Sequence, residues 1–223
     1  MLPVQDAMPS RTTPWVTIGF IALITAVLGL ELTRSVPSAR GLILSYGLVP
    51  AHLSPVTVLT APFLHHGLFD AVLQCIALWV FGDNVEDRLG RARFLLLFIG
   101  GAAVSGLAAV AASHASVLPI VGAAGGTGAV VGAHLVLFRE ARVLMLVPTG
   151  RDIDLVEIPA AAVAIAWLVL TALVAGALTT TAGRPAATLM PVVGLLIGAA
   201  LGRVLARSER LACDWWNQPT PRH

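Results

Sequence analysis

The 223-residue sequence contains no lysine, only two cysteines and few charged residues of any kind. Asp, Glu, Lys and Arg together make up 12% of the chain, whereas 57% of its residues are hydrophobic. So few charges would leave the surface of a soluble domain uncovered. The net charge of +2, with arginine as the only cation, also provides no extended basic surface for a phosphate backbone, so nucleic acid is not an expected partner. The sequence therefore predicts a protein of the lipid bilayer.

The two cysteines and the start of the chain exclude two further classes. Cys75 lies within an apolar run and Cys213 lies in the C-terminal tail, which fits neither a disulfide framework nor a metal site. The first apolar run begins at Trp15 and has no small-residue cleavage site before the next polar stretch. We therefore expect a retained helix rather than a signal peptide.

Five apolar segments are long enough, at roughly 20 residues, to cross about 30 Å of hydrocarbon. They cover residues 15–32, 94–112, 118–138, 158–178 and 187–205. A sixth segment, residues 63–81, is interrupted by His65, His66, Asp70 and Gln74. Because a polar side chain at membrane depth is costly, we expect this helix to line protein, with Asp70 at the interface as the alternative. The predicted fold is all-α, a polytopic membrane protein with six transmembrane helices.

The arginines predict the orientation, because cytoplasmic loops carry an excess of positive charge. With both termini in the cytoplasm, eleven arginines lie inside and three outside. The inner ones are Arg11, Arg88, Arg91, Arg93, Arg139, Arg142, Arg151, Arg203, Arg207, Arg210 and Arg222, and the outer ones are Arg34, Arg40 and Arg184. We expect a cytoplasmic N-terminal segment (residues 1–14), a transmembrane domain (15–207) and a cytoplasmic tail (208–223), with Trp215 and Trp216 as an interfacial anchor. The long outer connection, residues 34–62, is expected to hold a short interfacial or re-entrant element.

Small residues recur on the fourth and sixth predicted helices, at Gly122, Gly126, Gly128 and Gly132 and at Gly194, Gly198 and Gly202. Such spacings let two helix backbones approach closely within a membrane. We expect these two helices to hold their side chains within contact distance of each other.

The run LWVFGDNVEDRLG, residues 78–90, at the second helix and its following loop, closely resembles the rhomboid intramembrane serine proteases. The likeness extends to residues 46–50, 63–65, 121–125, 132–138 and 156–159, and so covers most of the chain from Tyr46 to Arg207. It implies a rhomboid-like bundle in which the second, fourth and sixth helices surround a polar, partly hydrated pocket open to the outside. It also implies that transmembrane substrates approach between the second and fifth helices.

In active relatives, a Ser in a Gly-x-Ser-Gly motif attacks the substrate and a His on the sixth helix takes its proton. Here the first motif reads Gly122-Ala123-Ala124-Gly125, and the glycines at 194 and 198 place the base at Pro191. A methyl group cannot attack a carbonyl, and proline has no proton-accepting side chain. The His and Asn that hold the oxyanion in the family correspond to Asp70 and Gln74, and an ionised Asp would repel the developing charge. Four altered positions on three helices predict a natural pseudoprotease rather than a laboratory knockout.

Other polar residues leave alternatives open. Thr127 could replace the nucleophile from the same helix face, although a Thr in such a helix more often bonds a backbone carbonyl. His134 is expected to satisfy a neighbouring carbonyl, with a proton relay as the alternative. His65, His66 and Asp70 form the only cluster that could bind a metal, and of these His66 and Asp70 would share a helix face. A third zinc ligand is not identifiable, since His65 fits the family motif as a loop or helix-entry residue, so no metal and no cofactor are expected.

The leading hypothesis is a catalytically inactive rhomboid-like protein of a bacterial plasma membrane that binds transmembrane segments of client proteins. Its expected partners are these clients and the lipid bilayer, and the sequence indicates no oligomeric state. The pocket or client-binding candidates are His65, His66, Asp70, Gln74, Gly122, Gly125 and Thr127. The alternatives are a rhomboid-family serine endopeptidase with a non-standard active site and a small transporter or channel that uses Asp70 and His134.

Overall fold

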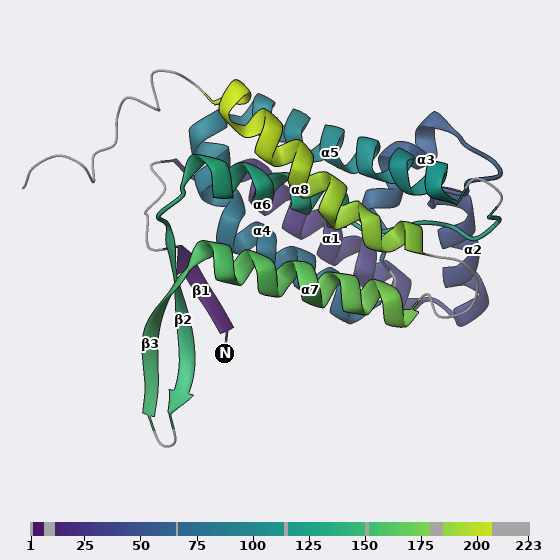
Figure 1. Cartoon of the computed structure of the whole chain (residues 1–223). Helices are drawn as coiled ribbons and strands as arrows, with labels where there is room; N and C mark the ends of the chain where they lie inside the picture. The colour runs from purple at the N-terminus through teal and green to yellow at the C-terminus, as the bar shows by residue number, and fades with distance from the viewer. Residues whose placement is uncertain are drawn as a thin grey trace, which may run out of the picture.

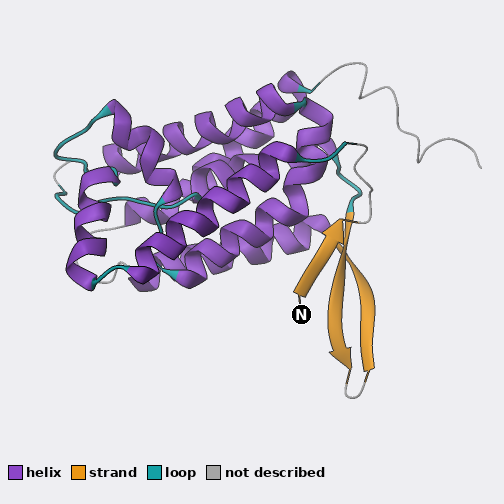
Figure 2. Ribbon diagram, turned by 180° about the vertical axis from the view of Figure 1, so that it is seen from behind, coloured by secondary structure: helices purple, strands orange, loops and turns teal. Residues whose placement is uncertain are grey.

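The computed structural model describes residues 2–6, 12–65, 67–113, 116–149, 152–178 and 185–206. Within these residues, five helices are long and apolar enough to cross a membrane, and a shorter apolar helix accompanies them (Figures 1 and 2). The six are α1 (Trp15–Thr33), α4 (Leu68–Leu89), α5 (Arg91–Ala112), α6 (Ala124–Leu137), α7 (Ala160–Leu178) and α8 (Pro185–Leu205). The expected all-α membrane bundle is confirmed.

The outer connection between α1 and α4 contains short helices of its own. These are α2 (Val36–Tyr46), α3 (Pro55–Thr60) and a 3-10 turn, η1 (Ala61–Phe63). Proline stands in the first turn of both α2 and α3, where its missing N–H removes no intrahelical hydrogen bond. The expected short element therefore consists of two helices, and we call the end of the bundle that carries them the loop end.

The second and fourth predicted helices have wrong bounds, and a glycine with positive φ lies beside each of them. The second membrane helix begins and ends later than expected, so residues 82–89 of the resemblance motif are helical rather than a loop. This helix ends at Gly90, whose φ of 80° favours glycine. The fourth membrane helix begins at Ala124 instead of residue 118, because Ile120 forms a β-bridge with Leu48 and Gly122 has a φ of 121°.

A small antiparallel sheet at the other end of the bundle, here called the sheet end, was not predicted. Its strands are β1 (Leu2–Asp6), β2 (Arg142–Thr149) and β3 (Asp152–Pro159), in the order β1-β2-β3. Two residues, Gly150 and Arg151, separate β2 from β3, and apolar runs flank them, which is a hairpin signal. Ile158, expected at the start of the fifth helix, lies in β3, and the expected N-terminal segment contributes β1.

Helices α6 and α8 meet backbone to backbone. A Cβ added at Gly198 would overlap the Ala129 carbonyl, one at Gly194 would overlap the Gly125 carbonyl, and one at Gly132 would overlap the Leu195 carbonyl. All residues of α6 from Ala124 to His134 are buried. The expected close contact of the fourth and sixth helices is thus confirmed, and glycine is required because any side chain would push the two helices apart.

The resemblance motif has a structural role, which is to attach α1 to the sheet end of α4. Gly82 leaves room for Thr17, since a Cβ there would come within 2.7 Å of the Thr17 methyl group. One turn later, the buried Glu86 accepts hydrogen bonds from the backbone N–H groups of Val16 (3.0 Å) and Thr17 (2.8 Å) and from the Thr17 hydroxyl (2.8 Å). A carboxylate at a helix N-terminus satisfies N–H groups that lack intrahelical partners and interacts favourably with the helix dipole.

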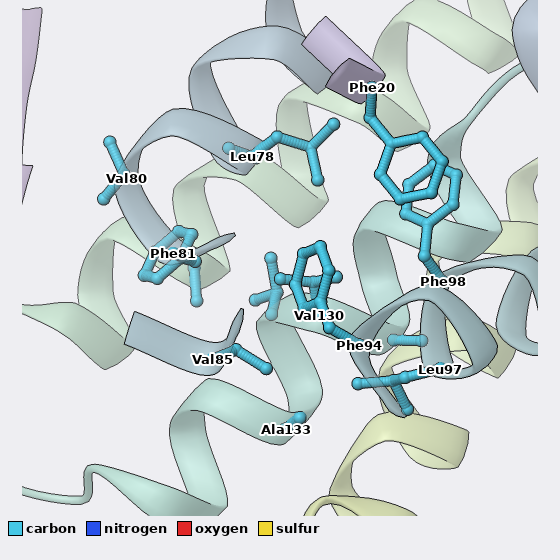
Figure 3. Close-up of a cluster of buried hydrophobic side chains, with 14 of the residues drawn as sticks. Phe20, Leu78, Val80, Phe81, Val85, Phe94, Leu97, Phe98, Val130 and Ala133 are labelled. Carbon is cyan, nitrogen blue, oxygen red and sulfur yellow. The ribbon is translucent and has the colours of Figure 1, made fainter. Parts of the chain in front are cut away.

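Aromatic side chains from several helices fill the space between α1, α4 and α5 (Figure 3). The rings of Phe20 and Phe98 stack with their centroids 4.0 Å apart, and Phe94 lies beside them with a centroid distance of 6.3 Å to Phe20. On α4, Arg88 lies over the ring of Phe138, 4.9 Å from its centroid, at the end of α6. These contacts fix the helices around α6.

The close contact of α6 and α8 predicts a specific loss of stability. Gly198→Ala should lower the free energy of unfolding by about 2 kcal/mol, because the new methyl group must displace the backbone of α6. Gly100→Ala is the matched control, since a Cβ at this exposed position meets nothing within 4 Å. Unfolding in mixed micelles of increasing denaturing detergent measures both, and equal midpoints for the two variants would contradict the packing described above.

A second expectation concerns Glu86. Glu86→Gln keeps the shape but removes the charge and one acceptor oxygen, so it should destabilise the protein by about 2 kcal/mol. Glu140→Gln, an exposed change of the same kind, should have little effect. The same unfolding measurement tests both, and hydrogen exchange should show faster exchange at Val16 and Thr17 in the Glu86 variant alone.

Candidate functional site

Most candidate residues come together at the loop end. Asp70 and Gln74 lie on the first turns of α4, Gly122 and Ala124 lie at the start of α6, and His65 precedes α4. Gly125, by contrast, lies in a packed contact. A Cβ added there would overlap the Ser105 side chain of α5, and a Cβ added at Gly194 of α8 would overlap the Gly125 carbonyl. His66 falls outside the described residues.

The Asp70 carboxylate lies beside the backbone that leads into α6. Its Oδ2 atom is 3.4 Å from the position that a Cβ on Gly122 would take, and its Oδ1 atom accepts a hydrogen bond from Gln74 Nε2 (3.3 Å). The N-terminus of α6 has no side-chain cap, so its dipole favours an anion there. By the resemblance, Asp70 stands at a position where a protease needs a hydrogen-bond donor for an oxyanion, and a carboxylate is an acceptor instead.

Glu31, at the end of α1, was missed by the sequence analysis. This largely buried carboxylate accepts a hydrogen bond from the His65 backbone N–H (3.2 Å), while its Oε2 atom has no hydrogen-bond partner among the described residues. Gln74 is fully buried, and its Oε1 atom likewise has none there. An acidic residue near the end of an otherwise apolar span was the signal that could have identified Glu31.

The position that the resemblance assigns to a nucleophile has apolar surroundings. Ala124 is 7% exposed and belongs to a hydrophobic cluster with Leu48, Ala61, Ile120 and Met190. Met190 precedes the position of the missing base and is itself buried. Its flexible thioether fills irregular apolar space well. Met190 was not among the residues predicted from the sequence.

Pro191 lies within α8 and is buried against α6. Its carbonyl oxygen is 2.6 Å from the position of a Cβ on Gly128, so this part of α8 faces the helix that carries Ala124. Gly194, one turn later in α8, contacts the Gly125 carbonyl, so residues 191–194 of α8 lie level with residues 125–128 of α6. The residue positions that the resemblance pairs, 124 and 191, therefore lie on helices that are in register for such a pair.

Thr127 and His134 do not extend this site. The Thr127 hydroxyl is fully buried and has no hydrogen-bond partner among the described residues, so the expected bond to a backbone carbonyl is absent there. The His134 ring packs edge-on against Phe81, with centroids 4.9 Å apart, and against Phe138. His134 lies ten residues along α6 from Ala124, about 15 Å away, so it is remote from Asp70.

A pocket of about 460 Å³ lies at the loop end, but the candidate residues do not line it. Its walls come from α2, α3 and the segments around them, including Tyr46, His52 and Val117. Among the described residues, no three His, Cys, Asp or Glu side chains form a group that could hold a metal ion.

In a comparison with protein families, residues 52–208 match the model described as the rhomboid domain. The chain belongs to the rhomboid family. No curated protein matches it. Together with the apolar helices, family membership makes the chain an integral, multi-pass membrane protein. The family assignment inferred from the motif at residues 78–90 is confirmed.

The apolar surroundings of Ala124 lead to a chemical prediction. In a variant with Cys75→Ala and Cys213→Ser, a thiol introduced as Ala124→Cys should react with a water-soluble maleimide roughly tenfold more slowly than one introduced as the exposed Ser45→Cys. Labelling rates of the reconstituted protein measure this. Equal rates would mean that water reaches position 124 freely.

Proposed function

We propose that this rhomboid family member is catalytically inactive. It binds the transmembrane segments of client membrane proteins and does not cleave these segments. The observation that carries the proposal is the combination of Ala124 and Pro191 on two helices whose glycine packing is intact. The scaffold of the family is present, and the two groups that perform its chemistry are absent.

Inactivity is supported by three features of the site. Neither Ala124 nor Pro191 can donate or accept a proton through its side chain. Met190 and its neighbours surround the nucleophile position with apolar groups. An ionised Asp70 would repel the negative charge that develops on a substrate oxygen. Loss of a single oxyanion donor already lowers the rate by about 10² to 10³, and a repelling charge at that position should lower it further.

Client binding is supported by helix α7, which by family resemblance borders the path of substrates together with α4. Only 22% of its span is buried, against 56% for α4, although the two helices are in contact. On its inner side, Trp167 Nε1 and Thr171 Oγ1 are buried and have no hydrogen-bond partner among the described residues. Because such groups are costly when left unpaired, a transmembrane segment that brings a polar residue between α4 and α7 would gain by pairing with them.

The proposed orientation places the sheet end, with both termini, in the cytoplasm of a bacterial plasma membrane. Six described arginines lie near this end, at positions 88, 91, 93, 139, 142 and 203, and two lie near the loop end, at positions 34 and 40. This asymmetry supports the orientation by the positive-inside rule. Clients would then meet Asp70 and Glu31 from the outer leaflet.

One experiment tests cleavage and binding together. Transmembrane reporter segments with one central Asn, or with Leu in its place, carry a photoreactive leucine and are reconstituted with the protein beside an active rhomboid. Mass spectrometry should show no cleaved product from the protein or from Ala124→Ser, and light should yield intact adducts, with more adduct for the Asn reporter. A cleaved product that Asp70→Ala or Thr127→Ala abolishes would contradict inactivity.

The paired variant Trp167→Phe and Thr171→Val makes the binding part of the test specific. It should reduce the adduct with the Asn reporter by roughly tenfold while leaving the protein at least as stable, because it removes unpaired buried polar groups. Thr33→Val, at an exposed hydroxyl bonded to its own helix, is the control and should change neither. An unchanged yield in the paired variant would contradict recognition at α7.

A further inference from the structure

The sheet extends sideways from the sheet end of the bundle, and β3 forms its outer edge. Figures 1 and 2 show β2 and β3 projecting away from the helices as a hairpin, with β1 beside it and with the C-terminal end of β3 leading directly into α7. β2 pairs with β1 on one side and β3 on the other, so one edge of β3 has no neighbouring strand among the described residues. An open edge offers backbone N–H and C=O groups to another extended chain.

The two edges of the sheet differ in how well they could accept a strand. β1 carries Pro3, which has no N–H to donate, and its pairing with β2 shifts register between Pro3 and Gln5. Both features interrupt strand addition. β3 has eight residues, pairs with β2 in continuous register, and contains proline only at its last residue, Pro159.

The exposed residues of β3 have a defined chemical pattern. Asp154, Leu155, Val156 and Glu157 are all exposed, Leu155 by 63% and Val156 by 40%. Because successive side chains point to opposite faces of a strand, Asp154 and Val156 share one face, and Leu155 and Glu157 share the other. β3 contains no basic residue, and the ion pair of Glu157 with Arg142 of β2, at 3.8 Å, is largely exposed and therefore weak.

We propose that the outer edge of β3 binds an extended, basic segment of a client membrane protein, adjacent to the client's transmembrane helix on the cytoplasmic side. The proposal rests on the client binding and the orientation proposed above. Cytoplasmic flanks of transmembrane helices are rich in Lys and Arg, which supplies the complementary charge. Directly opposite residues interact across paired strands, so the pattern basic-apolar-apolar-basic matches residues 154–157 in either strand direction.

Two other occupants fit less well. If two copies of β3 paired antiparallel about the centre between Leu155 and Val156, Asp154 of each copy would lie opposite Glu157 of the other, and like charges directly opposite are destabilising. An anionic lipid surface would be repelled by the same carboxylates. The acidic residues thus oppose self-association and select a basic strand.

A labelled peptide with the core Lys-Val-Val-Lys, added to the full-length protein in nanodiscs of neutral lipid, tests the proposal by fluorescence anisotropy. Glu157→Lys should weaken binding about threefold, and the double variant Asp154→Lys with Glu157→Lys roughly tenfold, while Glu140→Lys, the same change at an exposed residue outside the sheet, should not alter it. The double variant should instead bind a peptide with the core Glu-Val-Val-Glu. This gain of binding separates a changed edge from a sheet that has failed to fold.

A peptide of equal charge with the core Lys-Pro-Pro-Lys shows whether strand pairing is involved. It should bind at least about tenfold more weakly than the valine peptide, because proline cannot donate to a strand ladder. Equal binding of the two peptides, or equal effects of Glu157→Lys and Glu140→Lys, would overturn the proposal. Adduct formation with transmembrane reporters does not depend on this edge, so failure here leaves that result, and the proposed function, separately testable.

Discussion

The contact between the backbones of α6 and α8 is the constraint on which the rest of the structure depends. In a membrane, lipid is as apolar as leucine, so helices associate through close packing rather than through the hydrophobic effect. Gly128, Gly132, Gly194 and Gly198 allow this packing, and the residues of α6 from Ala124 to His134 are all buried. The remaining helices surround α6, and the loop end takes its shape from where α6 begins.

The site shows how a scaffold and its chemistry can separate. Packing at Gly125 and Gly194 depends on the absence of side chains, whereas catalysis depends on a hydroxyl and a base at two neighbouring positions. In the proposed inactive protein, Ala124 and Pro191 stand at the positions that the resemblance gives to the nucleophile and the base, and the helix contact is in place. What remains at the loop end is a set of buried acceptors, those of Glu31, Asp70 and Gln74, beside a dry cluster around Ala124.

The sequence predicted the features that depend on local pattern. Apolar length identified the membrane helices, and glycine spacing identified the contact of α6 with α8. It did not predict features that depend on distant partners. In the sequence Glu86 is only one residue of a motif, and the structure shows that the first turn of α1 donates hydrogen bonds to it. Glu31 likewise has its partner in the backbone of His65, which is distant in the sequence. β1 is only five residues long, and it forms a strand by pairing with β2, about 140 residues later in the sequence. Such a long-range pairing is not visible in the local sequence pattern.

The pairing of β1 with β2 joins two segments that are about 140 residues apart in the sequence, with membrane helices between them. Residues that share a hydrogen-bonded sheet must lie on the same side of the bilayer, and α1, α4, α5 and α6 are the apolar helices between these two strands. Four crossings return the chain to the side on which it began, so the sheet can form only if an even number of these crossings is made. The hairpin thereby serves as a check on the parity of insertion, since a chain that skips one helix would leave β1 and β2 in different compartments.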